Sequence, residues 1–246
     1  MSQVCIIIPC YNEESRLNME AFRSFLDNHN QLDLLFVNDG STDGTQKLID
    51  QLVANYDTVH QLRLAENRGK AEAIRQGMLF TTEMGKYQLA GYLDADLATP
   101  LNQILYLQES ILNNPDVHIV LGSRWMRLGS HINRNWLRHY LGRIFATMVS
   151  VIFRMEVYDT QCGAKVIRTL HLKKIFSEPF ISRWFFDIEI LLRMKQVFAS
   201  PVAQWAREVP ISHWNEIGNS RVAVWDFITV PFQLLKIKRH YHSKAR

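Results

Sequence analysis

The sequence has few cysteines and no long uninterrupted run of apolar residues. Cys5, Cys10 and Cys162 are odd in number and lack the paired spacing of a metal-binding motif. They therefore favour a reducing compartment over a disulfide framework. A membrane-spanning helix needs roughly 18 to 20 consecutive apolar residues, and no segment reaches that length. The first residues do not combine a basic region with an apolar one, so we expect no secretory signal and a cytoplasmic protein.

Two common nucleotide-binding motifs are also missing. No Gly-x-Gly-x-x-Gly follows the first strand-like segment, and no Gly-x-x-x-x-Gly-Lys-Ser/Thr occurs, which counts against dinucleotide sites and P-loop sites. The charge is only mildly unbalanced, since 28 Lys and Arg against 24 Asp and Glu leave a formal net charge of +4. This excess suits an anionic ligand such as a nucleotide phosphate or a lipid headgroup. It is too small to indicate a nucleic-acid partner.

Strand-like apolar segments alternate with helical patterns over the first half of the chain. The expected strands are 4–9, 32–37, 59–64, 88–93 and 117–121, and the expected helices are 14–29, 43–55, 70–84 and 101–113. With 47% hydrophobic residues, the chain can form one sizeable core. Buried strands alternating with helices predict an α/β fold with a mostly parallel sheet, in which ligands bind at the carboxyl ends of the strands.

The first four expected strands each end in a polar cluster. The clusters are Pro9-Cys10-Tyr11-Asn12-Glu13, Asn38-Asp39-Gly40-Ser41, Glu66-Asn67-Arg68-Gly69-Lys70 and Asp94-Ala95-Asp96. In an extended chain Asp94 and Asp96 project to the same side, so both can face one cation. Mg²⁺ and Mn²⁺ take carboxylate oxygens together with substrate phosphates. The tripeptide alone also fits a solvated turn, but its neighbours favour a nucleotide-diphosphate site.

Two segments in the second half of the chain combine aromatic, apolar and basic residues. In 134–155 several arginines precede an almost wholly apolar stretch, and the mostly apolar segment 222–235 is followed by a basic tail. Such helices suit a membrane interface, and packing against the sheet or another subunit is the alternative. We expect a domain over 1–221, including a candidate interfacial helix over 133–156, and a C-terminal amphipathic and basic segment over 222–246.

Together these motifs resemble the inverting family 2 glycosyltransferases of the GT-A fold, and among them the polyprenyl-phosphate (dolichyl-phosphate) hexosyltransferases. The resemblance rests on the four strand-end clusters and on Asp159-Thr-Gln-Cys-Gly-Ala-Lys165, and it extends from Pro9 to about Arg221. It implies a GT-A domain with a Rossmann-like, mostly parallel sheet flanked by helices, to which amphipathic helices are added.

The resemblance also implies roles for individual residues. The nucleotide sugar would be bound by Pro9, Tyr11, Glu13, Asp39, Lys70, Asp94 and Arg124. A Mg²⁺ or Mn²⁺ ion would be bound by Asp94 and Asp96. The candidate catalytic carboxylates are Asp159, Asp187 and Asp96, with Glu189 next. The candidates for acceptor binding are Arg127, Arg134, Arg138, Gln161 and Lys165.

Two later features resemble glucosyl-transferring rather than mannosyl-transferring relatives. Arg183-Trp-Phe-Phe-Asp-Ile-Glu189 is similar to a motif of the glucosyl branch. Mannosyl relatives usually place an arginine three residues before the glycine near the end of the domain, where this chain has Asn215. Trp214-x-Glu216 is also closer to the glucosyl pattern. UDP-glucose is therefore favoured over GDP-mannose. As a separate departure, many mannosyl relatives carry a glutamine where this chain has Ala98, so water could replace one ligand of the metal.

The sequence thus predicts transfer of glucose from UDP-glucose to a polyprenyl or dolichyl phosphate at the cytosolic membrane face, with inversion. Several relatives carry C-terminal transmembrane helices that this sequence lacks, so we expect peripheral membrane contact through interfacial helices or a membrane-protein partner. Two alternatives remain open. One is a family 2 glycosyltransferase that acts on a polysaccharide or glycan, and the other is a non-catalytic nucleotide-sugar-binding subunit of a membrane complex.

Overall fold

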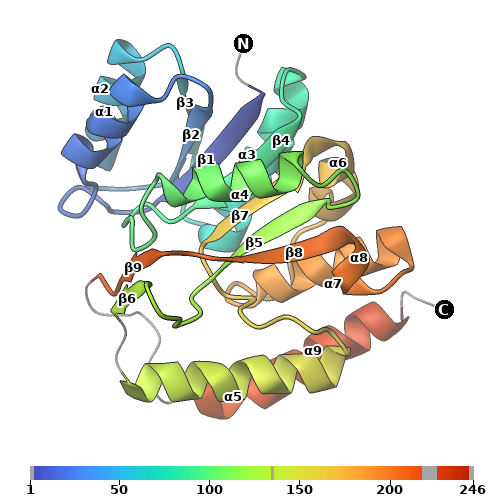
Figure 1. The fold of residues 1–246 in the computed structure, drawn as a ribbon. Coiled ribbons are helices and arrows are strands. Elements are labelled where there is room, and N and C mark those ends of the chain that lie inside the picture. The colour runs from blue at the N-terminus through green and yellow to red at the C-terminus, as the bar shows by residue number, and fades with distance from the viewer. Residues whose placement is uncertain (1–2, 134–135, 218–225, 244–246) are drawn as a thin grey trace.

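The computed structural model describes residues 3–133, 136–217 and 226–243, which are organised around an α/β sheet (Figure 1). The first half contains β1 (Val4–Cys10), α1 (Met19–Asn28), β2 (Asp33–Asp39), α2 (Thr45–Asn55), β3 (Val59–Leu64), α3 (Lys70–Met84), β4 (Leu89–Leu93), α4 (Gln103–Leu112) and β5 (Ile119–Ser123). The second half contains β6 (His131–Asn133), α5 (Trp136–Phe153), β7 (Ala164–Arg168), the 3-10 turn η1 (Thr169–His171), α6 (Leu172–Phe176), α7 (Phe186–Phe198), α8 (Val202–Trp205), β8 (Ala206–Pro210), β9 (His213–Asn215) and α9 (Asp226–Ser243).

The central sheet has the strand order β3-β2-β1-β4-β7-β5-β8. Its neighbouring strands are parallel except at β7, which runs antiparallel to both β4 and β5. β6 and β9 pair separately as a short parallel ribbon. The predicted α/β fold with a mostly parallel sheet is confirmed. The sequence patterns do not predict β7, because its five residues are few and begin inside the Cys-Gly-Ala-Lys motif.

Most expected elements form within a few residues of their predicted ends. The strand 59–64 and the helix 70–84 coincide with β3 and α3. The expected helix 14–29 starts too early, since α1 begins at Met19 and Asn18 caps it by accepting the Ala21 N–H at 3.0 Å. The preceding residues form a turn in which the Glu13 carbonyl accepts the backbone N–H groups of Arg16 and Leu17. Glu13 therefore stays near the end of β1.

Helices cover both faces of the sheet, and each face has its own core. Because side chains alternate along a strand, Ile6 and Ile8 of β1 pack with α1, α2 and α4, while Cys5 and Ile7 pack with α3 on the opposite face. All four side chains are fully buried. Burying one isoleucine contributes about 1.5 to 3 kcal/mol, so these contacts hold β1 and the loop at its carboxyl end in place.

α5 and α9 lie side by side and form an outer helical layer below the sheet (Figure 1). The buried side of this layer consists of Phe145, Val149 and Phe153 of α5 and Val230, Leu234, Ile237 and Tyr241 of α9. Other apolar side chains of the layer face outward, and they are Tyr140, Ile144, Val151, Phe232 and Leu235, each 44 to 73% exposed. Among the described residues, no helix combines the length and the apolar character needed to span a membrane.

A histidine pair, of which His171 is buried and His118 is half-buried, lies at the end of the sheet opposite to the strand-end clusters. His171 Nε2 is 3.0 Å from His118 Nδ1, and both rings contact Phe198. Burial lowers the pKa of His171 to about 4, whereas an unfolded chain binds this proton near pH 6.5. Because the unfolded state binds more protons between these two values, the free energy of unfolding falls as the pH drops from about 6.5 to 4.

We expect His171→Phe to remove part of this acid sensitivity. The difference between the urea midpoints at pH 7 and pH 5 should be smaller in the variant than in the unaltered protein. His242→Asn, at an exposed position of α9, serves as the control and should keep the original difference. An unchanged pH dependence in His171→Phe would show that His171 does not stay neutral in the folded state.

Candidate active site

The carboxyl ends of β1, β2 and β4 lie next to one another and carry most of the predicted nucleotide-sugar residues. β1 is the middle strand of the three, so Tyr11, Asp39 and Asp94 stand at or just after the ends of adjacent strands. Pro9 and Tyr11 are half-buried there. The fold therefore brings together clusters that are up to about eighty residues apart in the sequence, as the strand pattern predicts.

Hydrogen bonds tie the loop after β1 to the loop after β2. The Asn12 N–H donates to Ser41 Oγ at 3.0 Å, and the Glu13 N–H donates to Thr45 Oγ1 at 2.7 Å. The Glu13 carboxylate pairs with Arg16 at 2.5 Å. The two hydrogen bonds between the loops fix the end of β1 against the end of β2.

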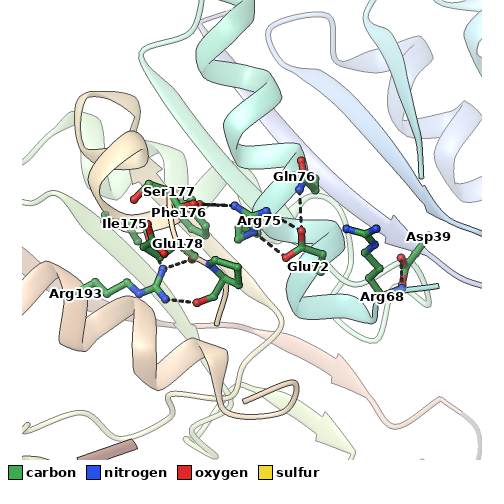
Figure 2. A network of polar contacts seen from close by, with 11 residues as sticks. Asp39, Arg68, Glu72, Arg75, Gln76, Ile175, Phe176, Ser177, Glu178 and Arg193 are labelled. Carbon is green, nitrogen blue, oxygen red and sulfur yellow. Dashed lines mark hydrogen bonds and ion pairs between the residues drawn. The ribbon is translucent and has the colours of Figure 1, made fainter. Parts of the chain in front are cut away.

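Asp39 shapes the loop that leads into α3. Its carboxylate accepts the backbone N–H groups of Arg68 at 2.9 Å and Gly69 at 2.7 Å, and Figure 2 shows Asp39 beside Arg68. At Gly40, with φ +65°, a Cβ atom would lie 2.5 Å from the Glu66 carbonyl carbon. Only glycine allows this approach of the two loops. The Asp39 carboxylate thus fixes the backbone at Arg68 and Gly69. Its contact with a nucleoside stays a prediction.

Lys70 and the two aspartates after β4 form the charged centre of this surface. Lys70 Nζ lies 2.5 Å from Asp94 Oδ1. Burial disfavours the ammonium, but the carboxylates of Asp94, Asp187 and Asp96 together outweigh this effect and raise the pKa of Lys70. Asp96 Oδ1 accepts the Ala98 N–H at 3.0 Å. Burial raises the pKa of Asp96, and the nearby Asp94 carboxylate adds to this effect.

The chemistry of these residues fits a divalent cation. The pKa of Asp96 is raised by burial and by the Asp94 carboxylate, and a cation would balance the negative charge of the two side chains. Within the described residues, no three His, Cys, Asp or Glu side chains gather to hold a metal. Asp94 and Asp96 would therefore supply the protein oxygens, and substrate phosphates and water would supply the others, as is usual for Mg²⁺.

The loop 159–163 approaches the Asp94 carboxylate closely at Gly163. A Cβ atom on Gly163 would come within 2.2 Å of Asp94 Oδ2, so any larger residue at this position would displace the carboxylate. The predicted acceptor-side motif, which begins at Asp159, is thus in contact with the predicted metal ligand.

Arg124 and Asp159 form a two-pronged ion pair at the start of this loop. Arg124 Nε and Nη2 donate to the two carboxylate oxygens at 2.7 and 2.8 Å, and the Arg124 N–H adds a bond at 3.1 Å. Burial alone would raise the pKa of Asp159, but the Arg124 guanidinium holds it well below its usual range. Glu208 accepts the N–H groups of Tyr158 and Asp159, both at 2.7 Å. Asp159 is therefore a fixed anion and a weak base.

Asp187 and Lys165 form a second ion pair below the loop. Lys165 Nζ lies 2.6 Å from Asp187 Oδ1 and donates to the Cys162 carbonyl at 2.7 Å. Tyr92 donates its hydroxyl proton to the same Asp187 oxygen. Lys165 is 0% exposed and Asp187 is 5% exposed, so both act from beneath the surface. Their predicted contacts with acceptor and reacting atoms remain predictions.

Three polar atoms near the Arg124–Asp159 pair are buried without a hydrogen-bond partner among the described residues. They are Ser123 Oγ, Thr160 Oγ1 and Gln161 Nε2. Leaving such groups unpaired costs about 1 to 3 kcal/mol each, and a polar ligand or water bound at this position would remove the cost. Gln161 belongs to the predicted acceptor-binding set.

A sequence model of the family Glycosyl transferase family 2 matches residues 5–176. The chain belongs to glycosyltransferase family 2. Its relatives include a dolichyl-phosphate beta-glucosyltransferase from Trichomonas vaginalis, 30% identical over 97% of this chain and 73% of that protein. The Homo sapiens protein of the same name is 32% identical over 99% of this chain and 77% of its own length.

The fold agrees with this membership. Glucosyl-3-phosphoglycerate synthase from Mycobacterium tuberculosis, solved with UDP, has a TM-score of 0.67 over 98% of this chain and 80% of that chain, at 13% identity. The same synthase solved with Mn²⁺, UDP-glucose and phosphoglyceric acid has a TM-score of 0.66 at 15% identity. At these identities the likeness establishes the fold, which is the predicted GT-A fold.

The other predicted residues are Arg127, Arg134 and Arg138 for the acceptor and Glu189 for catalysis. Arg127 is exposed in the loop after β5. Arg134 falls outside the described residues, and Arg138 belongs to α5, where its side chain is not described. Glu189 is fully buried and accepts the backbone N–H groups of Ile181 and Ser182.

Three further residues support the acceptor-side loop, and sequence reasoning did not assign them. Besides Glu208, the Arg143 guanidinium of α5 stacks on the Tyr158 ring at 3.7 Å, and Arg124 lies 5.5 Å from the Trp214 ring. In the sequence Arg143 stands out only as one of several arginines before an apolar stretch, and Glu208 only as a polar residue. Trp214 belongs to a pattern that resembles the glucosyl branch, but that pattern does not predict its contact with Arg124. Their roles depend on long-range contacts.

Removing the charge of Asp159 should destabilise the enzyme, because Arg124 would keep a largely buried charge without its partner. We expect Asp159→Asn to lower the free energy of unfolding by about 3 kcal/mol, measured by urea denaturation at pH 7. Glu66→Gln, which breaks a pair with Arg68 whose side chains are 70 and 59% exposed, is the control and should change little. Equal effects of both substitutions would contradict the buried role of Asp159.

Proposed function

We propose that this glycosyltransferase transfers glucose from UDP-glucose to dolichyl phosphate or a similar polyprenyl phosphate. We further propose that it acts at the cytosolic membrane face, with inversion at the sugar carbon and with Mg²⁺ or Mn²⁺. The observation that carries the proposal is the near-full-length similarity to dolichyl-phosphate beta-glucosyltransferases, combined with an acceptor-side loop that rests on Asp94. This contact supports an acceptor site beside the donor site.

On the donor side, Lys70, Asp94 and Asp96 would face the diphosphate. A cation held by the two aspartates, when bound, would neutralise charge that develops on the leaving UDP. Lys70 is paired with Asp94 at 2.5 Å, so its ammonium is already oriented toward this position. The structurally similar synthase from Mycobacterium tuberculosis was solved with Mn²⁺ and UDP.

On the acceptor side, an oxygen of the lipid phosphate would attack the sugar carbon as its bond to the UDP oxygen breaks. Attack from the face opposite to UDP inverts the configuration. A phosphate monoester has a second pKa of about 6, so it is largely ionised at neutral pH and needs no strong base. This agrees with the lowered pKa of Asp159. Asp159 would instead orient Arg124, whose guanidinium suits phosphate oxygens.

The outer helical layer would supply membrane contact. The helices α5 and α9 expose apolar surface at Tyr140, Ile144, Val151, Phe232 and Leu235. In the loop between β5 and β6, Trp125, Met126 and Leu128 are 51 to 103% exposed. Apolar and aromatic side chains beside basic residues favour insertion into the headgroup region. Contact through a membrane-protein partner would use the same surface.

The direct test is a transfer assay. Purified enzyme is incubated with dolichyl phosphate, Mg²⁺ or Mn²⁺ and radiolabelled UDP-glucose, UDP-galactose or GDP-mannose. We expect a chloroform-soluble labelled product from UDP-glucose above all. Transfer to phosphoglycerate or a glycan without lipid would favour a different acceptor, and nucleotide binding without any transfer would favour a non-catalytic subunit.

In the same assay Asp96→Ala should lower the rate by about 10² to 10³-fold, because one of two carboxylates for the cation is lost. Asp116→Ala removes an exposed carboxylate before β5 and is the control that should keep full activity. Retention of full activity by Asp96→Ala would exclude its role at the metal.

Membrane contact can be measured by flotation with vesicles that contain anionic lipid. Replacing two exposed side chains, as in Ile144→Ser with Phe232→Ser, should weaken vesicle binding about tenfold or more, since apolar burial in the interface is lost. Leu170→Ser on η1, where the side chain is 70% exposed, is the matched control and should bind normally. Equal binding of both variants would contradict the proposed membrane surface.

A further inference from the structure

The segment 175–185, which comprises the end of α6 and the connection to α7, has no regular structure over most of its length and is held by two arginines. Arg193 of α7 and Arg75 of α3 are each 9% exposed and donate to five of its carbonyl oxygens (Figure 2). The acceptors are Ile175, Glu178 and Pro179 at 2.6, 2.6 and 2.7 Å for Arg193, and Phe176 and Ser177 at 3.0 and 3.1 Å for Arg75. These bonds fix the first half of the segment.

Glu189 fixes the second half. Its carboxylate accepts the backbone N–H groups of Ile181 at 3.1 Å and Ser182 at 2.8 Å. Ser182 Oγ in turn accepts the Phe185 N–H at 3.0 Å. The backbone around Arg183 is thereby defined from both sides.

One hydroxyl group of α9 joins these two charged side chains. Tyr241 donates to Glu189 Oε2 at 2.8 Å and accepts from Arg193 Nε at 2.8 Å. Tyr241 is 7% exposed and Glu189 is 0% exposed, so water replaces neither bond easily. The outer layer also contacts the segment through Phe145 of α5, whose ring stacks on Phe185 at 5.3 Å.

The end of the segment reaches the donor side of the active site. Arg183 Cδ lies 3.8 Å from the position of a Cβ atom built on Gly69. Gly69 precedes Lys70 and donates its N–H to Asp39. The exposed Arg183 guanidinium therefore stands beside the loop where the proposed diphosphate would bind.

We propose that Tyr241 is a positioning residue for donor binding. Through Glu189 and Arg193 it holds the 175–185 segment so that Arg183 lies against the Gly69–Lys70 loop and contacts the anionic donor. This inference rests on the proposed function. It also links the outer helical layer, whose outward face carries Phe232 on α9, to the site of nucleotide binding.

The test compares donor and acceptor parameters in Tyr241→Phe, which keeps the ring and removes the hydroxyl. We expect the KM for UDP-glucose and the Kd for UDP, measured by calorimetry without lipid, to rise about five- to tenfold, with the KM for dolichyl phosphate unchanged. Adding Tyr241→Phe to Arg183→Ala should raise the Kd no further, because both act through the same contact. His242→Asn, at the next position of α9, is the control.

An unchanged Kd for UDP in Tyr241→Phe would overturn the inference. A Kd in the double variant that is raised by the product of the two single-variant factors would overturn it too, because independent effects add as free energies. A lower kcat with unchanged KM would indicate only a smaller active fraction, and it too would contradict donor positioning. The Kd comparison needs no transfer. If the unaltered enzyme binds UDP but does not glucosylate the lipid, the proposed acceptor is rejected. The Kd comparison would still decide the role of Tyr241.

Discussion

The contact of Asp94 with Lys70 on one side and Gly163 on the other is the constraint on which the active site depends. Lys70 begins α3 and lies 2.5 Å from the carboxylate, while Gly163 precedes β7 and leaves no room for a side chain. The pairing of Leu93 with Ala164 in the antiparallel β4–β7 pair produces this contact. Because β7 runs antiparallel to its neighbours, the residues before it come to the carboxyl end of β4, where the predicted donor residues lie.

Around this contact the enzyme arranges charges in pairs before any ligand binds. Arg124 with Asp159 and Lys165 with Asp187 are largely buried pairs with distances of 2.6 to 2.8 Å. Buried pairs often add little to stability but are costly to break, so they hold the 159–163 loop in one arrangement. Such fixed charges are effective for transfer chemistry, because they need no reorganisation when charge moves onto a leaving group.

Sequence reasoning predicted the half of the site that local patterns encode. Apolar runs followed by polar clusters indicate strands and their ends, so the positions of Asp39, Lys70 and Asp94 followed from the parallel sheet. The other half depends on pairings across many residues. Arg124 and Asp159 are 35 residues apart, and Tyr241 and Glu189 are 52 apart. No local period encodes such contacts, and the same holds for β7.

The sequence likewise singled out Lys165 and Asp187, because both occur in motifs of the family, and it predicted contact with the acceptor and the reacting atoms. That contact stays a prediction. The structure surrounds both side chains with protein, and Lys165 donates to the Cys162 carbonyl. A motif identifies a constrained residue, whereas its burial and hydrogen-bond partners decide whether it reaches a ligand directly or acts through a loop.

The central claim is that Asp94 and Asp96 bind a divalent cation together with a nucleoside diphosphate. It is tested most directly by the electron paramagnetic resonance signal of free Mn²⁺, titrated with enzyme in the presence and absence of UDP. The account predicts that the enzyme removes free Mn²⁺ far more strongly when UDP is present, and that Asp96→Asn abolishes this UDP-dependent uptake. Equal uptake by Asp96→Asn and the unaltered enzyme would contradict it.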